Sequence, residues 1–243
     1  EAADGLADGA GGEAAFKAPP PVCALEAAVG VESVPAATVI ATDSQLEAWG
    51  QVVSFKPCSL GLSALPQAIS HLSALTLLWA NDNELRTLPA LPSSLTELYL
   101  QRNALVELPD ALVGALPELQ SLWVHHNQLT SLPESVGALS CLRDLAAFRN
   151  QLQALPDSLC TLTSLRALRL DDNRLTALPL AIGELRRLEH LDVSNNRLRA
   201  LPRSIGKLLN LCSLRVWLNQ LATFPDEIGE LGELGEISAS QNE

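Results

Sequence analysis

The stretch LRALRLDDNRLTALP at residues 165–179 is followed 23 residues later by LEHLDVSNNRLRALP at residues 188–202. Each copy carries aliphatic residues at matching places, one fixed asparagine and a closing Leu-Pro. The asparagine recurs in the same frame at intervals of 20, 24 and then five times 23 residues, as Asn83, Asn103, Asn127, Asn150, Asn173, Asn196, Asn219 and Asn242. A fixed period of this length decides the architecture, because each unit must pack against the next.

Within a unit, two aliphatic residues separated by one position precede the asparagine, as Leu168 and Leu170 precede Asn173. That spacing has the period of a strand, so both point inward while their neighbours point out. The asparagine follows where the chain must turn, and its amide can both donate to and accept from unpaired backbone groups. We therefore expect the eight asparagines to form a structural ladder and not a binding site, with a cost of about 1–3 kcal/mol for a lost rung.

The pattern LxxLxLxxNxL resembles the signature of the leucine-rich repeat family from about Leu60 to the end of the chain. The resemblance implies an α/β solenoid of about eight to nine repeats. Such a curved horseshoe has a concave parallel β-sheet and short 3-10 or α segments on its convex side. The sequence pattern of the convex side, LPxxIGxLxxLxxL, resembles that of the intracellular, Ras-group and Scribble-like branch with 23-residue repeats. The unit containing residues 88–95 is three residues shorter and resembles the repeats of bacterial secreted effectors.

Three regions are expected along the chain. Residues 1–22 read as a flexible acidic Ala/Gly/Pro tail. Residues 23–59 read as an N-terminal cap region, with a short helix near 43–52. Residues 60–243 form the solenoid, and the segment from Phe55 to Leu62 reads as a degenerate first repeat. No polar C-terminal cap follows the last repeat, so we expect the natural chain to continue or a partner to cover that face.

Charge and motif content exclude several function classes. The chain has 28 acidic and 16 basic residues, a formal charge of −12. That balance argues against nucleic acid as a partner, and no apolar run approaches the ~20 residues of a membrane span. There is no Gly-rich phosphate loop, nucleophile elbow or zinc-protease motif, so we expect no enzyme activity, no catalytic residue and no cofactor.

The five cysteines are Cys23, Cys58, Cys141, Cys160 and Cys212. They are scattered, odd in number and lack metal-ligand spacing, so no metal site is expected. We interpret them as buried small hydrophobes in a reducing compartment. The location expected is intracellular, in the cytoplasm or in an organelle after removal of a transit peptide.

In this architecture the ligand face is the concave sheet, whose outward positions lie six, four, two and one residues before each asparagine. Five of the nine aromatic residues fall there. Rings on successive strands lie about 4.8 Å apart and would form one patch, and such patches mark interaction sites. The residues expected to bind the partner are Trp79, Tyr99, Arg102, Trp123, His125, Phe148, Arg149, Arg169, Asp192, Arg215 and Trp217.

The sequence therefore predicts a non-enzymatic scaffold or interaction module that binds a protein or peptide. Replacing Trp79 and Trp123 by Ala is expected to abolish binding and leave stability almost unchanged. Aromatic residues on neighbouring strands can instead pack on each other and stabilise the sheet. Arg169 and Arg215 can likewise pair with Asp192 across strands. Two other functions stay open: the substrate-recognition arm of a larger effector or ubiquitin-ligase-type protein, and a structural subunit of an assembly.

Overall fold

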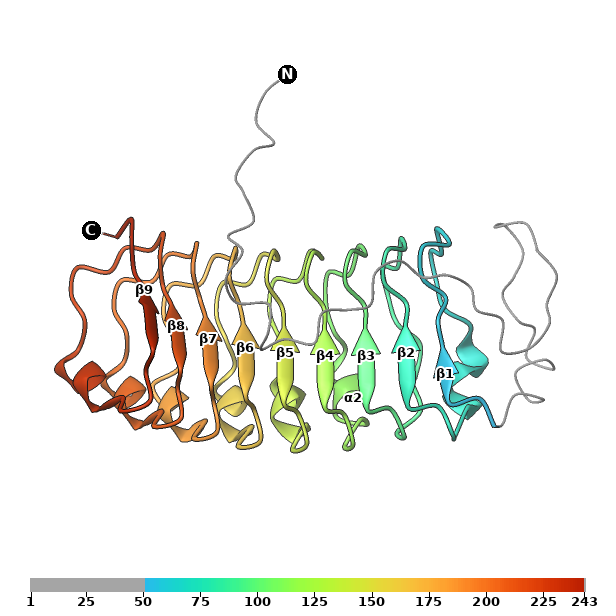
Figure 1. The fold of residues 1–243 in the computed structure, drawn as a ribbon. Helices are drawn as coiled ribbons and strands as arrows, with labels where there is room; N and C mark the ends of the chain where they lie inside the picture. The colour runs from blue at the N-terminus through green and yellow to red at the C-terminus, as the bar shows by residue number, and fades with distance from the viewer. Residues whose placement is uncertain (1–50, 243) are drawn as a thin grey trace, which may run out of the picture.

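The computed structural model describes residues 51–242. In this part of the chain, nine parallel strands form one open sheet, and their order in the sheet is their order along the chain. Figure 1 shows the strands side by side, with the short helical segments set away from them on the other side of the solenoid. The strands are β1 (Ser54–Phe55), β2 (Leu77–Trp79), β3 (Glu97–Tyr99), β4 (Ser121–Trp123), β5 (Asp144–Ala146), β6 (Ala167–Arg169), β7 (His190–Asp192), β8 (Ser213–Arg215) and β9 (Glu236–Ser238). The predicted α/β solenoid is confirmed.

The convex side is built from short helical segments, most of which begin directly after the proline of Leu-Pro or Phe-Pro. Proline suits this place because its fixed φ fits the start of a helical turn and its missing N–H is not needed there. The segments are η2 (Gln67–His71), α2 (Asp110–Val113), η3 (Glu134–Ala138), η4 (Asp157–Thr161), η5 (Ile182–Glu184), η6 (Arg203–Lys207) and η7 (Asp226–Glu230).

The shortened unit has no helical segment between β2 and β3. Its outer wall is only a turn, in which the Leu95 amide donates to the carbonyl of Pro92. Beside it lies an apolar hollow of about 240 Å³, lined in part by Leu88, Leu91 and Leu112. The three missing residues thus remove one piece of the convex wall while the strand spacing is kept.

The aliphatic residues of successive repeats form one continuous core that runs the length of the solenoid. In the repeat that decided the architecture, Leu165, Leu168, Leu170 and Leu175 are fully buried. From the convex side, Ile182 and its equivalents pack onto the same core. Each repeat buries its leucines against its two neighbours, which explains why the units do not fold as separate domains.

The asparagine ladder is present and does what its chemistry predicts. Asn173 Oδ1 accepts a hydrogen bond of 3.0 Å from the Leu152 amide of the preceding repeat. Its Nδ2 donates to the carbonyls of Ala147 at 3.0 Å, Leu170 at 3.0 Å and Asp171 at 3.2 Å. One side chain therefore supplies the Leu152 amide with its acceptor and links three carbonyls of two adjacent repeats.

The residue before each ladder asparagine adopts a left-handed backbone conformation, which the sequence analysis did not predict. The φ values of these residues lie between 48° and 57°, and the residues are Asp82, Arg102, His126, Arg149, Asp172, Asn195, Leu218 and Gln241. Asp and Asn tolerate this region better than most residues. The turn directs the following asparagine side chain into the solenoid.

The predicted degenerate first repeat is confirmed. Leu60 stands in the place of the ladder asparagine, and Ser59 before it has a φ of 55°. The amide of Leu62, two residues after Leu60, donates to Asn83 Oδ1 at 3.0 Å, just as the amide of Leu85, two residues after Asn83, donates to Asn103 Oδ1 at 3.0 Å. Residues 1–22 and the greater part of the cap region 23–59, including the predicted helix near 43–52 up to residue 50, lie outside the described residues.

The expectation of free thiols is wrong for one of the described cysteines. Cys58 is buried and disulfide-bonded. Cys141, Cys160 and Cys212 are free, and of these only Cys160 is buried. The interpretation of the cysteines as small buried hydrophobes therefore holds for Cys160 alone among the described four.

Glycines on the convex wall lie against the next repeat too closely for a side chain. A Cβ on Gly183 would lie 2.1 Å from the carbonyl oxygen of Ser204. Gly183→Ala is therefore expected to lower the free energy of unfolding by about 1–3 kcal/mol, because the backbone must shift to accept the methyl group. Gly229 occupies the same place two repeats later, where a Cβ would meet nothing within 4 Å. Urea unfolding of Gly183→Ala and of the control Gly229→Ala would contradict this account if both variants lost the same stability.

Candidate functional site

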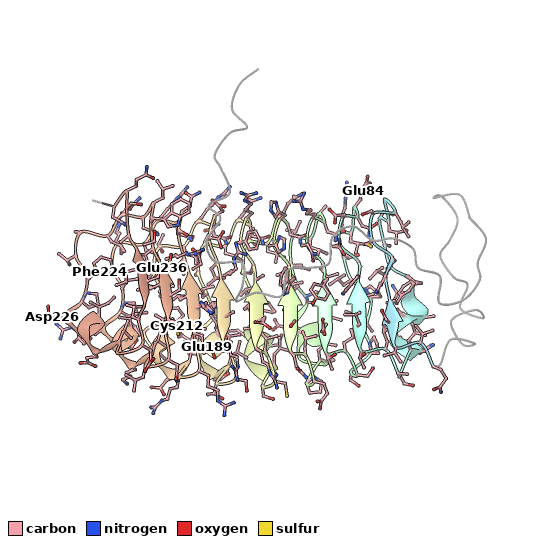
Figure 2. The ribbon with its side chains drawn as sticks, in the orientation of Figure 1. Glu84, Glu189, Cys212, Phe224, Asp226 and Glu236 are labelled. Atoms are coloured by element: carbon pink, nitrogen blue, oxygen red, sulfur yellow. The ribbon has the colours of Figure 1, made fainter. Side chains whose placement is uncertain are left out.

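The sheet register brings the predicted row of side chains together on one face. Trp79 pairs with Tyr99, Tyr99 with Trp123, and Trp123 with Ala146 across adjacent strands. The row then continues through Arg169, Asp192, Arg215 and Ser238. In Figure 2, Glu236 on β9 marks the C-terminal end of this face, and Glu189 and Cys212 mark the edge where the chain enters β7 and β8.

The aromatic rings on this row contact one another directly. The ring centroids of Trp79 and Tyr99 are 5.7 Å apart at 88°, and those of Tyr99 and Trp123 are 5.6 Å apart at 60°. Together with Ala146, these rings form a second apolar cluster on the sheet, separate from the main core. The contiguous patch is therefore present, and edge-to-face contacts of this kind stabilise it.

The prediction that these rings are exposed is wrong for two of them. Tyr99 and Trp123 are each only 5% exposed, because the rings of the cluster cover one another. Trp79 at the end of the row is half-buried, and Lys56 Nζ lies 4.1 Å from its ring centroid. Tyr99 Oη also donates to Glu97 at 2.7 Å. The row thus supplies a rigid floor with accessible side chains at its margins.

A second stack begins two residues before the asparagines. The rings of His125 and Phe148 are stacked, with their centroids 4.0 Å apart and their planes at 11°. The guanidinium carbon of Arg169 lies 4.2 Å from the centroid of the Phe148 ring. Burial is the main reason that the pKa of His125 is lowered to about 3, and the positive charges of His126 and Arg169 contribute to this value. His125 is therefore neutral at physiological pH, and its buried ring stacks flat against Phe148.

In the aromatic half of this face, three buried polar atoms have no hydrogen-bond partner within residues 51–242: Trp79 Nε1, Gln101 Oε1 and His125 Nδ1. Gln101 is 4% and His125 7% exposed. Buried polar groups are normally paired, and an unpaired one costs about 1–3 kcal/mol. Because these side chains stand on the outward side of the sheet, a molecule lying on the concave face can supply the missing donors and acceptors.

The C-terminal half of the face is charged. Arg169 Nε lies 3.5 Å from Asp171 Oδ1, close enough for an ion pair although that oxygen accepts no hydrogen bond. Burial raises the pKa of Asp171 to about 7, and the neighbouring charge of Asp192 raises it too. Burial is also the main reason that the pKa of Asp192 is raised. The face therefore holds two carboxyl groups for which ionisation is costly.

The ion pairs around Asp192 differ from those expected. Asp192 accepts hydrogen bonds from the Ser194 hydroxyl and, at 3.1 Å, from the Ser194 amide. Arg215 Nε lies 3.5 Å from Glu236 Oε1 on the next strand. Arg169 and Arg215 act on Asp192 through their charge, which lowers its pKa against the effect of burial. Asp192 is therefore held by its own turn, and both arginines bridge to other carboxylates.

Along the edge of the face, the left-handed residues form a chain of charges. Arg102 Nε lies 3.8 Å from Asp82 Oδ1, and Arg149 Nε lies 3.1 Å from Asp172 Oδ2. Between them, Arg149 Nη1 lies 3.4 Å from His126 Nε2. The side chains of Arg102 and Arg149 are 62% and 56% exposed. Such exposed pairs add little stability but are available to a partner.

Asp171 makes stability depend on pH. Its folded pKa of about 7 is above its usual value of 3.8, so the stability it contributes is present below about pH 4 and is lost as pH rises to about 7. Asp171→Asn is therefore expected to be more stable than the natural chain at pH 8, with the difference shrinking toward pH 4. Urea unfolding at pH 8 and pH 5 measures this, with Asp157→Asn on the exposed convex side as control. A difference that is the same at both pH values would contradict it.

The predicted site residues thus fall into two groups. Tyr99, Trp123 and His125 are buried in the floor, and the rest are half-buried or exposed: Trp79, Arg102, Phe148, Arg149, Arg169, Asp192, Arg215 and Trp217. Gln101 and Asp171 were not predicted. Both stand two residues before a ladder asparagine. The signal in the sequence that could have identified them is a polar residue at this outward position of the sheet.

Within residues 51–242, no group of three or more His, Cys, Asp and Glu side chains is placed to hold a metal ion. In the same part of the chain, no helix has both the length and the apolar character needed to cross a membrane.

Comparison with known proteins agrees with this architecture. The description "Leucine rich repeat" matches residues 93–152, and "Leucine-rich repeat region" matches residues 153–242. Among solved structures, a leucine-rich repeat protein of Leptospira interrogans is 27% identical with a TM-score of 0.57, covering 75% of this chain and 59% of its own.

Two receptor kinases of Arabidopsis are also similar. The leucine-rich repeat ectodomain of GASSHO1/SCHENGEN3, in complex with CASPARIAN STRIP INTEGRITY FACTOR 2, is 30% identical with a TM-score of 0.67, over 74% of this chain and 23% of its own. HAESA, in complex with the peptide hormone IDA and the co-receptor SERK1, is 29% identical with a TM-score of 0.69, over 79% of this chain and 34% of its own. The chain therefore spans less than two thirds of the length of each of these three structures.

Proposed function

The chain belongs to the leucine-rich repeat family, whose domains are commonly protein–protein interaction modules, and from that premise we propose that it binds a protein or peptide across its concave face. On this proposal the chain has no catalytic activity of its own and acts as a scaffold. The observation that carries the proposal is the floor of packed rings together with two buried, unpaired polar atoms on the same face, Gln101 Oε1 and His125 Nδ1. A peptide backbone offers the N–H and C=O groups that such atoms require.

The margins of the face supply the remaining contacts. Arg102 and Arg149 present exposed guanidinium groups along one edge. Trp217, two residues after the end of β8, is half-buried. Arginine and tryptophan are the residues that most often dominate binding energy at interfaces. The buried rings of Tyr99 and Trp123 hold the floor rigid, so that little ordering is needed when the partner binds.

The proposal is tested by comparing two faces of the solenoid. A partner is captured from an extract of the native source, purified, and its Kd is measured against the natural chain and two double variants. Arg149→Ala with Trp217→Ala is expected to weaken binding at least tenfold, because it removes one exposed and one half-buried anchor from the concave face. Leu180→Ala with Leu209→Ala removes two exposed side chains away from the sheet and is the matched control. Equal Kd values for both variants would place the partner elsewhere.

A second candidate is the recognition arm of a larger effector or ubiquitin-ligase-type protein. The unit without a convex helical segment between β2 and β3 favours it. Expression of the complete gene product and an assay for transfer of ubiquitin to the captured partner would test it. Capture of the same partner without any transfer would contradict it.

A further inference from the structure

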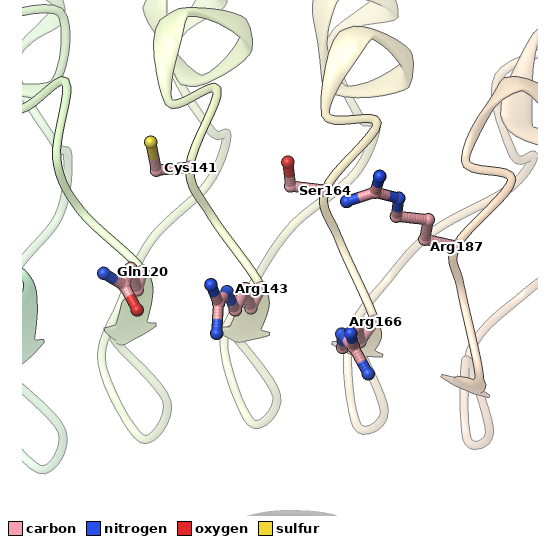
Figure 3. A pocket seen from close by; sticks show the side chains of 6 residues that line it. All are labelled: Gln120, Cys141, Arg143, Ser164, Arg166 and Arg187. Carbon is pink, nitrogen blue, oxygen red and sulfur yellow. The ribbon is translucent and has the colours of Figure 1, made fainter.

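A polar hollow of about 190 Å³ lies on the solenoid edge where the chain enters the strands. Its lining comes from four consecutive repeats, at the places nine and seven residues before the asparagine. Figure 3 shows these side chains: Gln120, Cys141, Arg143, Ser164, Arg166 and Arg187. None of them belongs to the concave floor, although Arg143 and Arg166 directly precede β5 and β6.

The hollow concentrates positive charge in an acidic protein. Three of its six lining side chains are arginines and none is acidic, whereas the whole chain carries −12. Arg166 is neutralised by Glu189, since Arg166 Nη1 donates to Glu189 Oε1 at 2.9 Å. Within residues 51–242, Arg143 and Arg187 form no ion pair, unlike Arg102 and Arg149 on the other edge. The hollow thus holds two arginines outside ion pairs, of which Arg143 also acts through its charge on the neighbouring Asp144.

The donor set defines the ligand chemistry. Each guanidinium presents five N–H donors in a planar fork, and the Ser164 hydroxyl and the Gln120 amide add further donors. A single carboxylate would neutralise only one arginine. A phosphate monoester carries about −1.5 to −2 charge at pH 7 and three acceptor oxygens, which matches two arginines that form no ion pair and a hydroxyl.

We propose that this hollow binds the phosphate group of a phosphorylated serine or threonine of the partner protein. Its position at the start of β5 and β6 places a phosphate there at the border of the concave face. A partner lying on that face would then present its phosphorylated residue to Arg143, Arg166 and Arg187. The assignment of the phosphate to a partner protein rests on the proposed function, whereas the phosphate chemistry of the hollow does not.

The first experiment uses the chain alone and small probes at constant ionic strength. N-acetyl-O-phosphoserine amide and inorganic phosphate are titrated by NMR or calorimetry, with unphosphorylated N-acetylserine amide as the blank. Both phosphate probes are expected to bind. Arg143→Gln with Arg187→Gln is expected to weaken both at least tenfold, and the control Arg174→Gln with Arg199→Gln, which removes the same charge from exposed positions, less than twofold.

Two outcomes would overturn the proposal. Equal weakening in both double variants would mean that the probes respond only to net charge. Binding of inorganic phosphate with exclusion of the phosphoserine probe would mean that the hollow takes a free ion and not a phosphorylated side chain. Unfolding curves of the two variants check that each is folded.

A second experiment separates this proposal from the concave-face proposal. The purified partner is treated with phosphatase, and we expect its Kd to rise at least tenfold for the natural chain and to stay unchanged for Arg143→Gln with Arg187→Gln. Arg149→Ala with Trp217→Ala is expected to keep full binding of the phosphoserine probe. If that probe binds normally and phosphatase has no effect on the partner, the assignment of the phosphate to the partner is wrong. The concave site is then still judged by its own variants.

Discussion

Asn196→Ala is expected to lower the free energy of unfolding by about 1–3 kcal/mol, the cost of one orphaned buried polar group, because the buried amide of Leu175 loses its acceptor. Asn196 Oδ1 accepts from the Leu175 amide at 2.9 Å. Its Nδ2 donates to the carbonyls of Leu170, Val193 and Ser194 at 2.9, 3.1 and 3.0 Å. The residue is only 8% exposed, so water cannot replace these bonds. Removing the side chain leaves the Leu175 amide without an acceptor. The three carbonyls each keep one other donor, from Asn173 Nδ2, Asn219 Nδ2 and the Asp172 amide.

Urea unfolding followed by circular dichroism measures this effect. The matched control is Asn210→Ala, an exposed asparagine whose Nδ2 donates to a single carbonyl, that of Arg186, at 2.6 Å. We expect the control to cost less than about 1 kcal/mol, the usual net value of one hydrogen bond. If Asn196→Ala lowered the free energy of unfolding no more than the control does, the asparagine ladder would not stabilise the solenoid as proposed.

Trp123→Ala is expected to lower the free energy of unfolding by about 3–5 kcal/mol, the range for truncating a large buried aromatic residue. Trp123 is 5% exposed, and its ring contacts Tyr99 at 5.6 Å and His125 at 5.8 Å between centroids. Its truncation would open a hole in the floor of the concave face. The expectation from sequence, that the Trp79 and Trp123 double replacement leaves stability almost unchanged, is therefore replaced by this one.

The control for Trp123→Ala is Trp217→Ala, which is on the same face but half-buried and outside the aromatic cluster. Thermal unfolding of both variants, monitored by circular dichroism, is expected to show the larger loss for Trp123. A smaller loss for Trp123 than for Trp217 would mean that the rings do not stabilise the sheet. Trp123→Ala is also unsuitable for measuring binding, because a weaker affinity could come from lost contacts with the partner or from lost structure of the sheet.

The regular part of the fold could be predicted because the same sequence pattern recurs at a nearly constant spacing. The asparagine spacing fixed the number of turns, and the alternation around Leu168 and Leu170 fixed which side chains enter the core. The same frame placed Trp79, Tyr99 and Trp123 on adjacent strands, as their ring contacts confirm. These features depend only on distances along the chain and on strand geometry.

What could not be predicted depends on contacts between particular side chains. Outward direction does not equal exposure: the ring of Tyr99 is buried because two tryptophans flank it, and the amide of Gln101 is buried without a partner. Polar contacts also follow local turns: Asp192 accepts hydrogen bonds from Ser194, and the arginines beside it act on it through their charge. The polar hollow depends on Arg143 and Arg187 lying two repeats apart, outside the strand frame.

The measurement that tests the central claim most directly is site-specific photo-crosslinking in an extract of the native source. A photoreactive amino acid is placed at Arg149 on the concave edge in one variant and at Leu209, exposed away from the sheet, in another. The account predicts a specific crosslinked partner from position 149 and none from position 209. A partner captured only from position 209, or equally from both, would contradict binding across the concave face.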